Sequence, residues 1–283
     1  RKEVMKELIR NDPQQALRIA LPKKVKQEFP RTVQGDIEEE VELTGNLIVS
    51  HTDDFERNLA QYNYILQTAD NKQTVLHFGD NESSIQSAKS VKVTGFSLGS
   101  EMAVQTTVEL TPQSNITSQA LTLTAKKALV LLINFTDNTT QPWTIEQVKS
   151  AIFGASNSVN SYYTEQSFNQ LSISGKVNSD GDVYGWYTIP YDSSVCKTVI
   201  TLSNAANVAA QAAGVDTTGY DNYMYVFPKA SSCLWAGSGD ITPMEGNAPR
   251  SFINGWGTNV FVISHELGHN FGTHHASGYN CTD

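Results

Sequence analysis

The run Ala128 to Phe135 (ALVLLINF) constrains the fold of this chain most, because nearly all of its side chains are apolar. A strand buried on both faces has such a continuous apolar run, whereas a strand with one face in water alternates apolar and polar residues. Downstream, the pattern predicts helices at 144–167 and 195–214 and strands at 170–177 and 222–228. Alternating strands and helices predict an α/β layer with a mixed, mostly parallel sheet.

The first 125 residues have a different pattern. Two short helices are predicted at 1–10 and 12–20, the second with Asp12 as its N-cap and Pro13 at its first position. Period-two stretches separated by turn residues then predict strands at 41–49, 62–68, 72–78, 90–96 and 101–110. We therefore predict an α+β protein with a mostly-β N-terminal domain at 1–125 and an α/β domain at 126–283.

Charge and cysteine content indicate which classes of partner and which cellular compartment suit this chain. The net charge is −9 and no basic stripe could follow a phosphate backbone, so we expect no nucleic-acid partner. The longest apolar run is about a third of a membrane span, so we expect no membrane-spanning segment. The second half is rich in Asn, Ser and Thr and holds all three cysteines, Cys196, Cys233 and Cys281. These features favour a secreted protein with a disulfide, and the odd cysteine would have its partner outside this sequence.

The segment Ser264 to His275 (SHELGHNFGTHH) holds four of the six histidines. It continues a predicted buried helix that ends at Gly272. His265 and His269 are four positions apart, so both imidazoles lie on one helix face and can reach one ion. Gly272 lets the chain turn in a left-handed conformation, which brings His275 toward the same point.

Three neutral imidazoles with an open fourth position are typical of a catalytic zinc site. Zinc lowers the pKa of water from near 16 to roughly 7, and Glu266 can take the proton of a water that attacks a carbonyl. The pattern HExxHxxGxxH should occur by chance on the order of once in a hundred thousand chains of this length. His274 competes as third ligand, but the spacing from Gly272 favours His275, and we expect His274 to face solvent or to support a ligand.

The stretch HELGHNFGTHHASGYNC, preceded by ITPMEGNAPRSFINGW, resembles the gametolysin family of the metzincin zinc metalloendopeptidases. The likeness is strong over 230–283 and extends back to Ala128, where the order of elements resembles a metzincin upper subdomain. It implies that His265, His269 and His275 bind one catalytic zinc and that Glu266 is the general base. It also implies that a polypeptide substrate adds a strand to an edge strand within 232–253.

Metzincins carry a methionine-containing turn downstream of the third histidine, which forms a floor under the metal. All four methionines of this sequence precede the histidine segment, and the sequence ends eight residues after His275. We therefore expect the C-terminal subdomain to lie beyond Asp283, or on a cleaved segment that would be a partner of this chain.

By the same resemblance, residues 1–125 are interpreted as a pro-region that keeps the enzyme inactive. Lys126 and Lys127 form a candidate processing site, although lysines also commonly flank a buried strand. No cysteine precedes Cys196, so this region cannot supply a thiolate to zinc. Asp36 in VQGDI and Asp80 in HFGD resemble the Phe-x-Gly-Asp segment of astacin pro-regions and are the candidate latency ligands.

The predicted function is a secreted zinc endopeptidase in a proenzyme-like form. The alternative is a catalytically incomplete, zinc-bearing binding or adhesion module that uses the N-terminal β domain as its functional surface. His51 and His77 are interpreted as structural histidines within predicted strands. Asp180 and Asp182 could suggest a Ca²⁺ loop, but the closing Glu of an EF-hand is missing and a polar turn is favoured.

Overall fold

A computed structural model describes residues 1–79, 85, 87–109, 124–241 and 248–275 of the chain. The chain divides into two compact units. The first unit holds residues 1–50, 62–116 and 243–245, and the second unit holds residues 51–61, 117–242 and 246–283. The domain division at 125 and 126 stays a prediction, but residues 51–61 from the N-terminal half belong to the second unit.

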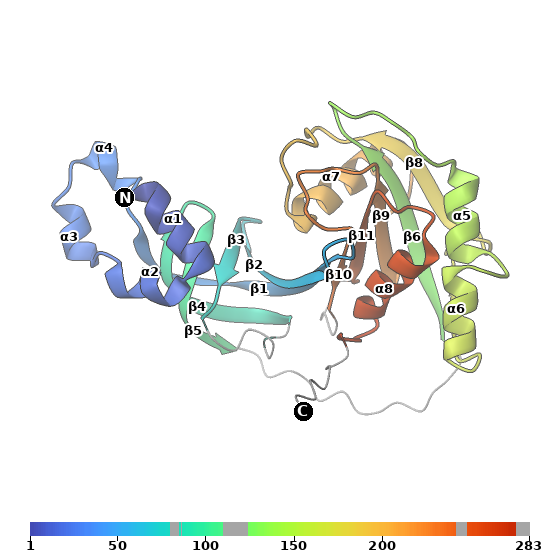
Figure 1. Ribbon diagram of the computed structural model, residues 1–283, viewed down its shortest axis with the longest axis horizontal. Coiled ribbons are helices and arrows are strands. Elements are labelled where there is room, and N and C mark those ends of the chain that lie inside the picture. The colour runs from blue at the N-terminus through green and yellow to red at the C-terminus, as the bar shows by residue number, and fades with distance from the viewer. Residues whose placement is uncertain (80–84, 86, 110–123, 242–247, 276–283) are drawn as a thin grey trace. The chain divides into compact units, whose positions relative to one another are not determined.

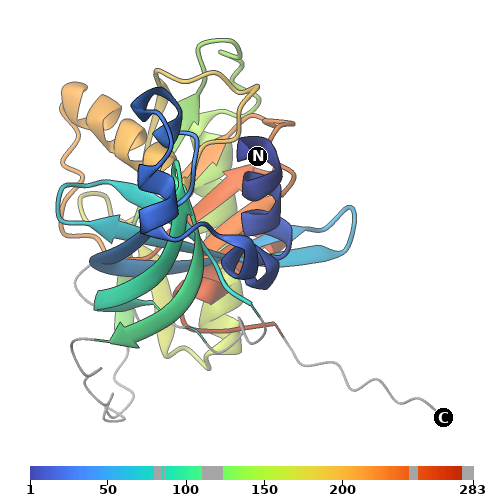
Figure 2. The same ribbon diagram turned by 90° about the vertical axis from the view of Figure 1, so that its left-hand side faces the viewer.

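The first unit begins with helices that lie against a mostly antiparallel group of strands (Figures 1 and 2). Met5, Ile9 and Ala16 are buried against Leu98 and Ala103, so the helices and the strands share one small core. Its helices are α1 (Lys2–Asn11), α2 (Pro13–Ile19), α3 (Lys23–Gln27) and α4 (Arg31–Gln34). Its strands are β1 (Glu39–Asp54), which continues into the second unit, β2 (Leu59–Thr68), β3 (Gln73–His77), β4 (Ala88–Leu98) and β5 (Glu101–Glu109). The expected pair of short helices and the five expected strands are therefore present.

The second unit is built on β6 (Thr124–Asn134), which pairs in parallel with β7 (Leu171–Ser174), β8 (Asp182–Thr188) and β9 (Asn222–Phe227). Strand β11 (Arg250–Asn254) is parallel to β9, and β10 (Gly237–Asp240) is antiparallel to β11. The expected mixed sheet is therefore confirmed. The end of β1 follows β10 in the strand order.

Helices cover both faces of this sheet, which explains why β6 is apolar throughout (Figure 1). Ala128, Val130 and Leu132 share a core with α5 (Ile145–Phe153), α6 (Val159–Gln166) and α8 (Val260–Asn270). On the opposite face lies α7 (Val199–Ala212), where the hydroxyl of Tyr225 bonds Asn207 at 3.1 Å.

Three sequence-based assignments in this unit are wrong. The helix expected over 144–167 is two helices, because Gly154 ends α5 and Ser158 caps α6 with a capping box. The stretch 230–258, in which periodicity predicts no strand, contains β10 and β11; only the family resemblance predicts a strand there. Strand β8 was not expected, because its sequence DVYGWYT has no period-two alternation.

Cys196 and Cys233 form a disulfide that joins positions 37 residues apart, as the cysteine usage predicts for one pair. Cys281 lies outside the described residues.

Among the described helices, none combines the length and the apolar character needed to cross a membrane.

Candidate metal centre

Helix α8 carries the histidine motif, and polar side chains at both of its ends fix its position. Asn259 caps its N-terminus by accepting the N–H of Val262 at 3.1 Å. At its other end the amide of Asn270 donates to the carbonyl oxygens of Asp240 and Arg250, both at 2.9 Å. Asn270 therefore ties the last turn of α8 to β10 and β11, which limits how far the motif can shift.

Two glycines of β10 allow α8 to pack directly beneath that strand. A Cβ on Gly237 would overlap Oε1 of Glu266, and a Cβ on Gly239 would lie 2.9 Å from Cβ of His269. Any larger residue at Gly237 would push the carboxylate of Glu266 away. The two glycines in the sequence GSGD of β10 thus leave the space that Glu266 and His269 of α8 occupy.

The structure brings three predicted ligands together. The Nε2 atoms of His265 and His275 are 3.0 Å apart, and the ring of His269 lies 5.0 Å from that of His265 and 5.3 Å from that of His275 between centroids. The chain reaches His275 through Gly272, whose φ of +85° is left-handed. The adjacent His274 lines a cavity of about 910 Å³ beside the same three rings.

The backbone fixes the tautomer of His269. Its Nδ1–H donates to the carbonyl oxygen of Thr273 at 2.8 Å, so Nε2 carries a lone pair. That Nε2 atom is buried and has no hydrogen-bond partner among the described residues. Burial, the first cause, and the neighbouring histidines lower the pKa of His275, which keeps its imidazole neutral. Among the described residues, Nε2 of His269 thus lacks a partner, while the Nε2 atoms of His265 and His275 contact each other. Converging imidazole nitrogens of this kind suit a bound cation, and nitrogen donors in this number suit zinc.

Asp53, which the sequence did not single out, lies among these imidazoles. Its carboxylate oxygens are 3.4 Å from Nε2 of His265, 3.5 Å from Nε2 of His269 and 3.0 Å from Nε2 of His275. His51, interpreted above as structural, bonds the same carboxylate through Nδ1 at 3.0 Å. Both residues are buried and belong to the second unit. HTDD gives no local signal for either residue, because the strand that carries it mixes polar and apolar residues along its length.

Glu266 lies beside this cluster and is fully buried. Both of its carboxylate oxygens lack a hydrogen-bond partner among the described residues, and one lies within 4.8 Å of ligand atoms of His265 and Asp53. Burial, and to a lesser degree the charge of Asp53, raise the pKa of Glu266 well above its ordinary value. A carboxylate with a raised pKa is a stronger base, which suits it to accept a proton from water.

The other predicted residues lie elsewhere or outside the described ranges. Asp36 is in the first unit, exposed, and pairs with Lys2 at 2.6 Å. Asp80 lies outside the described residues. Lys126 and Lys127 lie inside β6, opposite Ile173 and Ser174 of β7, rather than before the strand. Cleavage at these lysines stays a prediction and would require this pairing to open.

Asp182 organises a turn. Its carboxylate accepts the backbone N–H groups of Lys176, Val177 and Asn178 at 2.6–2.9 Å. Asp180 instead pairs with Lys149 at 2.7 Å. These bonds account for both aspartates without calcium, in line with the favoured polar turn.

Residues 127–282 match the family described as Gametolysin peptidase M11. The match covers the histidine motif and nearly all of the strands of the second unit that follow residue 126, but not His51 and Asp53, and it supports the family resemblance drawn from the motif. No curated protein matches the chain.

Proposed function

Since the chain belongs to the gametolysin peptidase M11 family, a family of metallopeptidases, we propose that it is a zinc-dependent endopeptidase of metzincin type. His265, His269 and His275 hold the ion, and Glu266 is the general base. The observation that carries this proposal is the set of buried atoms without partners at one point, Nε2 of His269 and both oxygens of Glu266. Such atoms are costly unless something binds them.

A zinc ion at this place supplies a Lewis acid that polarises the scissile carbonyl and acidifies water. The residues of the chain do the rest. Thr273 holds the imidazole of His269 in the tautomer that leaves Nε2 free, and Glu266 accepts the proton of the attacking water on a carboxylate oxygen. The same carboxyl then donates that proton to the departing amine. The cavity of about 910 Å³ beside the histidines gives a polypeptide room to approach.

We further propose that the enzyme is secreted and that residues 1–125 are a pro-region. The disulfide between Cys196 and Cys233 supports an oxidising compartment. We expect β10, which lies directly over Glu266, to be the strand within 232–253 that receives an extended peptide. It pairs with β11 on one side and follows β1 on the other, so its edge is free only when the end of β1 is displaced.

The test compares the full-length protein with its Glu266→Ala variant, both after limited proteolysis that activates the proenzyme. We expect cleavage of an unfolded protein substrate to fall by about 10²–10⁴-fold, the usual contribution of a general base, while zinc content stays unchanged. Glu165→Ala, on the exposed side of α6, is the control and should keep full activity. Undiminished cleavage by Glu266→Ala would contradict the proposed role.

A further inference from the structure

The carboxylate of Asp53 lies where a fourth ligand of the ion would lie. Ligand atoms around a tetrahedral zinc are about 3.3 Å from one another, given bond lengths near 2.0–2.1 Å. The oxygens of Asp53 are 3.0–3.5 Å from the three histidine Nε2 atoms, and two of those nitrogens are 3.0 Å apart. The Asp53 carboxylate therefore lies within 3.5 Å of all three imidazole nitrogens, with Oδ2 beside Nε2 of His265 and of His269 and Oδ1 beside Nε2 of His275, as expected for a fourth ligand.

The neighbouring residues hold Asp53 in this position. Nδ1 of His51 donates to Oδ2 of Asp53 at 3.0 Å, and the His51 ring packs against that of His275 at 4.2 Å between centroids. The carbonyl oxygen of Asp53 accepts the backbone N–H of Ala236 at 2.7 Å, immediately before β10. The segment therefore lies as an added strand along the edge that an extended peptide substrate would use.

Phe55 adds an apolar contact on the far side of the ligands. Its ring lies 5.4 Å from the ring of Phe261 and 5.1 Å from that of His265, both in edge-on geometry. Phe261 stays 66% exposed, so Phe55 covers only part of it. The two edge-on contacts hold the Phe55 ring beside His265.

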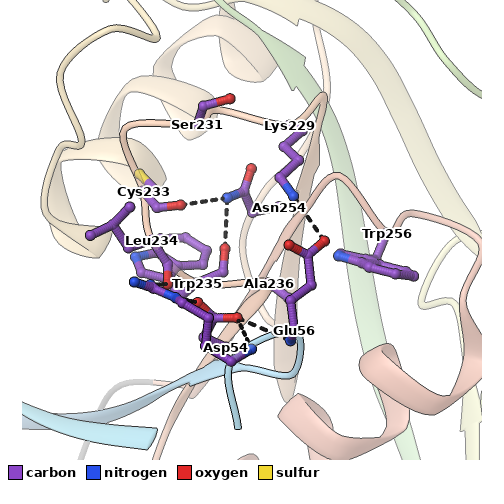
Figure 3. A pocket seen from close by; sticks show the side chains of 11 residues that line it. Asp54, Glu56, Lys229, Ser231, Cys233, Leu234, Trp235, Ala236, Asn254 and Trp256 are labelled. Atoms are coloured by element: carbon purple, nitrogen blue, oxygen red, sulfur yellow. Dashed lines mark hydrogen bonds and ion pairs between the residues drawn. The ribbon is translucent and has the colours of Figure 1, made fainter. Parts of the chain in front are cut away.

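Polar contacts fasten the turn that follows. Arg57 donates to the carbonyl oxygen of Leu234 at 2.8 Å and pairs with Asp54, and Lys229 pairs with Glu56 at 3.0 Å. Figure 3 shows this ion pair between Glu56 and Lys229, and both residues line a cavity of about 190 Å³. These partners are exposed and individually weak, so they are suited to a segment that can be released.

We propose that residues 51–57 are a built-in occupant of the metal site, in which Asp53 is the fourth metal ligand and His51 positions its carboxylate. This inference rests on the proposed function. While the segment is bound, the ion has no position for water and β10 has no free edge for substrate. The site opens only when the segment leaves, by cleavage or by displacement.

The test uses the full chain loaded with Co²⁺, whose visible absorption reports its coordination, and acetohydroxamate as a probe that needs an open metal position. In the native chain we expect a spectrum that acetohydroxamate barely changes. Asp53→Ala should bind the probe at least about tenfold more tightly, because the competent fraction rises toward one. Asp53→Asn, which keeps the shape and loses the charge, serves if the alanine variant does not fold.

Further variants separate the role of Asp53 from those of Asp36 and His51. Asp36→Ala, the candidate from the first unit, should leave the spectrum and the probe affinity unchanged. His51→Ala should give an intermediate affinity, and His51→Gln, which keeps an N–H donor, should restore the native value.

The possible failures are distinguishable. If the native and Asp53 variants both hold one Co²⁺ and bind the probe equally, the inference is overturned while the proposed function stands. If neither the native chain nor the Asp53 variants retain Co²⁺ at the histidines, the inference and the proposed function both fail.

Discussion

Gly237 of β10 lies so close to Glu266 of α8 that a Cβ on the glycine would overlap Oε1 of the carboxylate. The strand and the helix therefore need glycine at this position to keep the carboxylate beside the histidines. No comparable restriction applies to Gly35, where a Cβ would meet nothing within 4 Å.

Gly237→Ala should therefore displace Glu266 and lower peptide cleavage by about 10²-fold or more, with the zinc content retained. The measurement is the cleavage rate of a labelled unfolded protein after the same activating proteolysis of each chain, together with metal analysis of the same sample. Gly35→Ala is the matched control. Native activity in Gly237→Ala would mean that cleavage does not depend on the present position of the Glu266 carboxylate.

Asn254→Asp tests how the loop before β10 is held. The Asn254 amide donates to the carbonyl oxygens of Ala230, Cys233 and Trp235 at 2.7–3.3 Å (Figure 3). An aspartate would place negative charge against these three acceptors. We expect a loss of about 3 kcal/mol, which lowers the thermal midpoint by roughly 6–12 °C.

Asn157→Asp, at an exposed position between α5 and α6, is the control for this substitution and should shift the midpoint by no more than the equivalent of about 0.5 kcal/mol. Equal shifts of the thermal midpoint in the two variants would show that the hydrogen bonds from the Asn254 side-chain amide do not support the loop.

Asp182→Asn tests the turn before β8, and its effect should depend on pH. Burial opposes the charge of Asp182, but the N–H donors of Val177 and Asn178 outweigh it and hold the pKa of this carboxyl below its ordinary value. A lowered pKa stabilises the fold fully above the unfolded value near 3.9, and this contribution is lost as pH falls through the folded pKa.

The free-energy difference between native protein and Asp182→Asn should therefore be about 3 kcal/mol at pH 7 and smaller by about 1 kcal/mol at pH 3. Denaturant unfolding in the presence of a chelator measures it without interference from metal binding. The same difference at both pH values would contradict the assigned role of the charge.

Local geometry explains which parts of the site could be predicted from the sequence. His265, Glu266 and His269 are neighbours because of the period of one helix, and Gly272 permits the turn to His275. Asp53 reaches the site only through long-range pairing of β1 near β10, and no local pattern in HTDD reports that pairing. Aspartates in Gly-Asp segments were considered in its place for that reason.

The elements of the fold likewise fall into those that leave a signal in the sequence and those that do not. The apolar run of β6 and the helical periodicity of α7 and α8 predicted the α/β layer, because burial on both faces leaves a direct sequence signal. Strands β10 and β11 gave no such signal. Gly237 and Gly239 are selected by the close approach of α8, so their strand looks like a loop in the sequence.

Metal analysis tests the central claim most directly. The purified chain, loaded with Zn²⁺ and freed of excess metal, should contain one zinc per chain, and His265→Ala together with His269→Ala should reduce this to none. Far-ultraviolet circular dichroism of the double variant checks that it remains folded. One zinc in the native chain that is lost in the variant is the predicted result; a native chain that holds no zinc, or a folded variant that keeps it, would contradict the account.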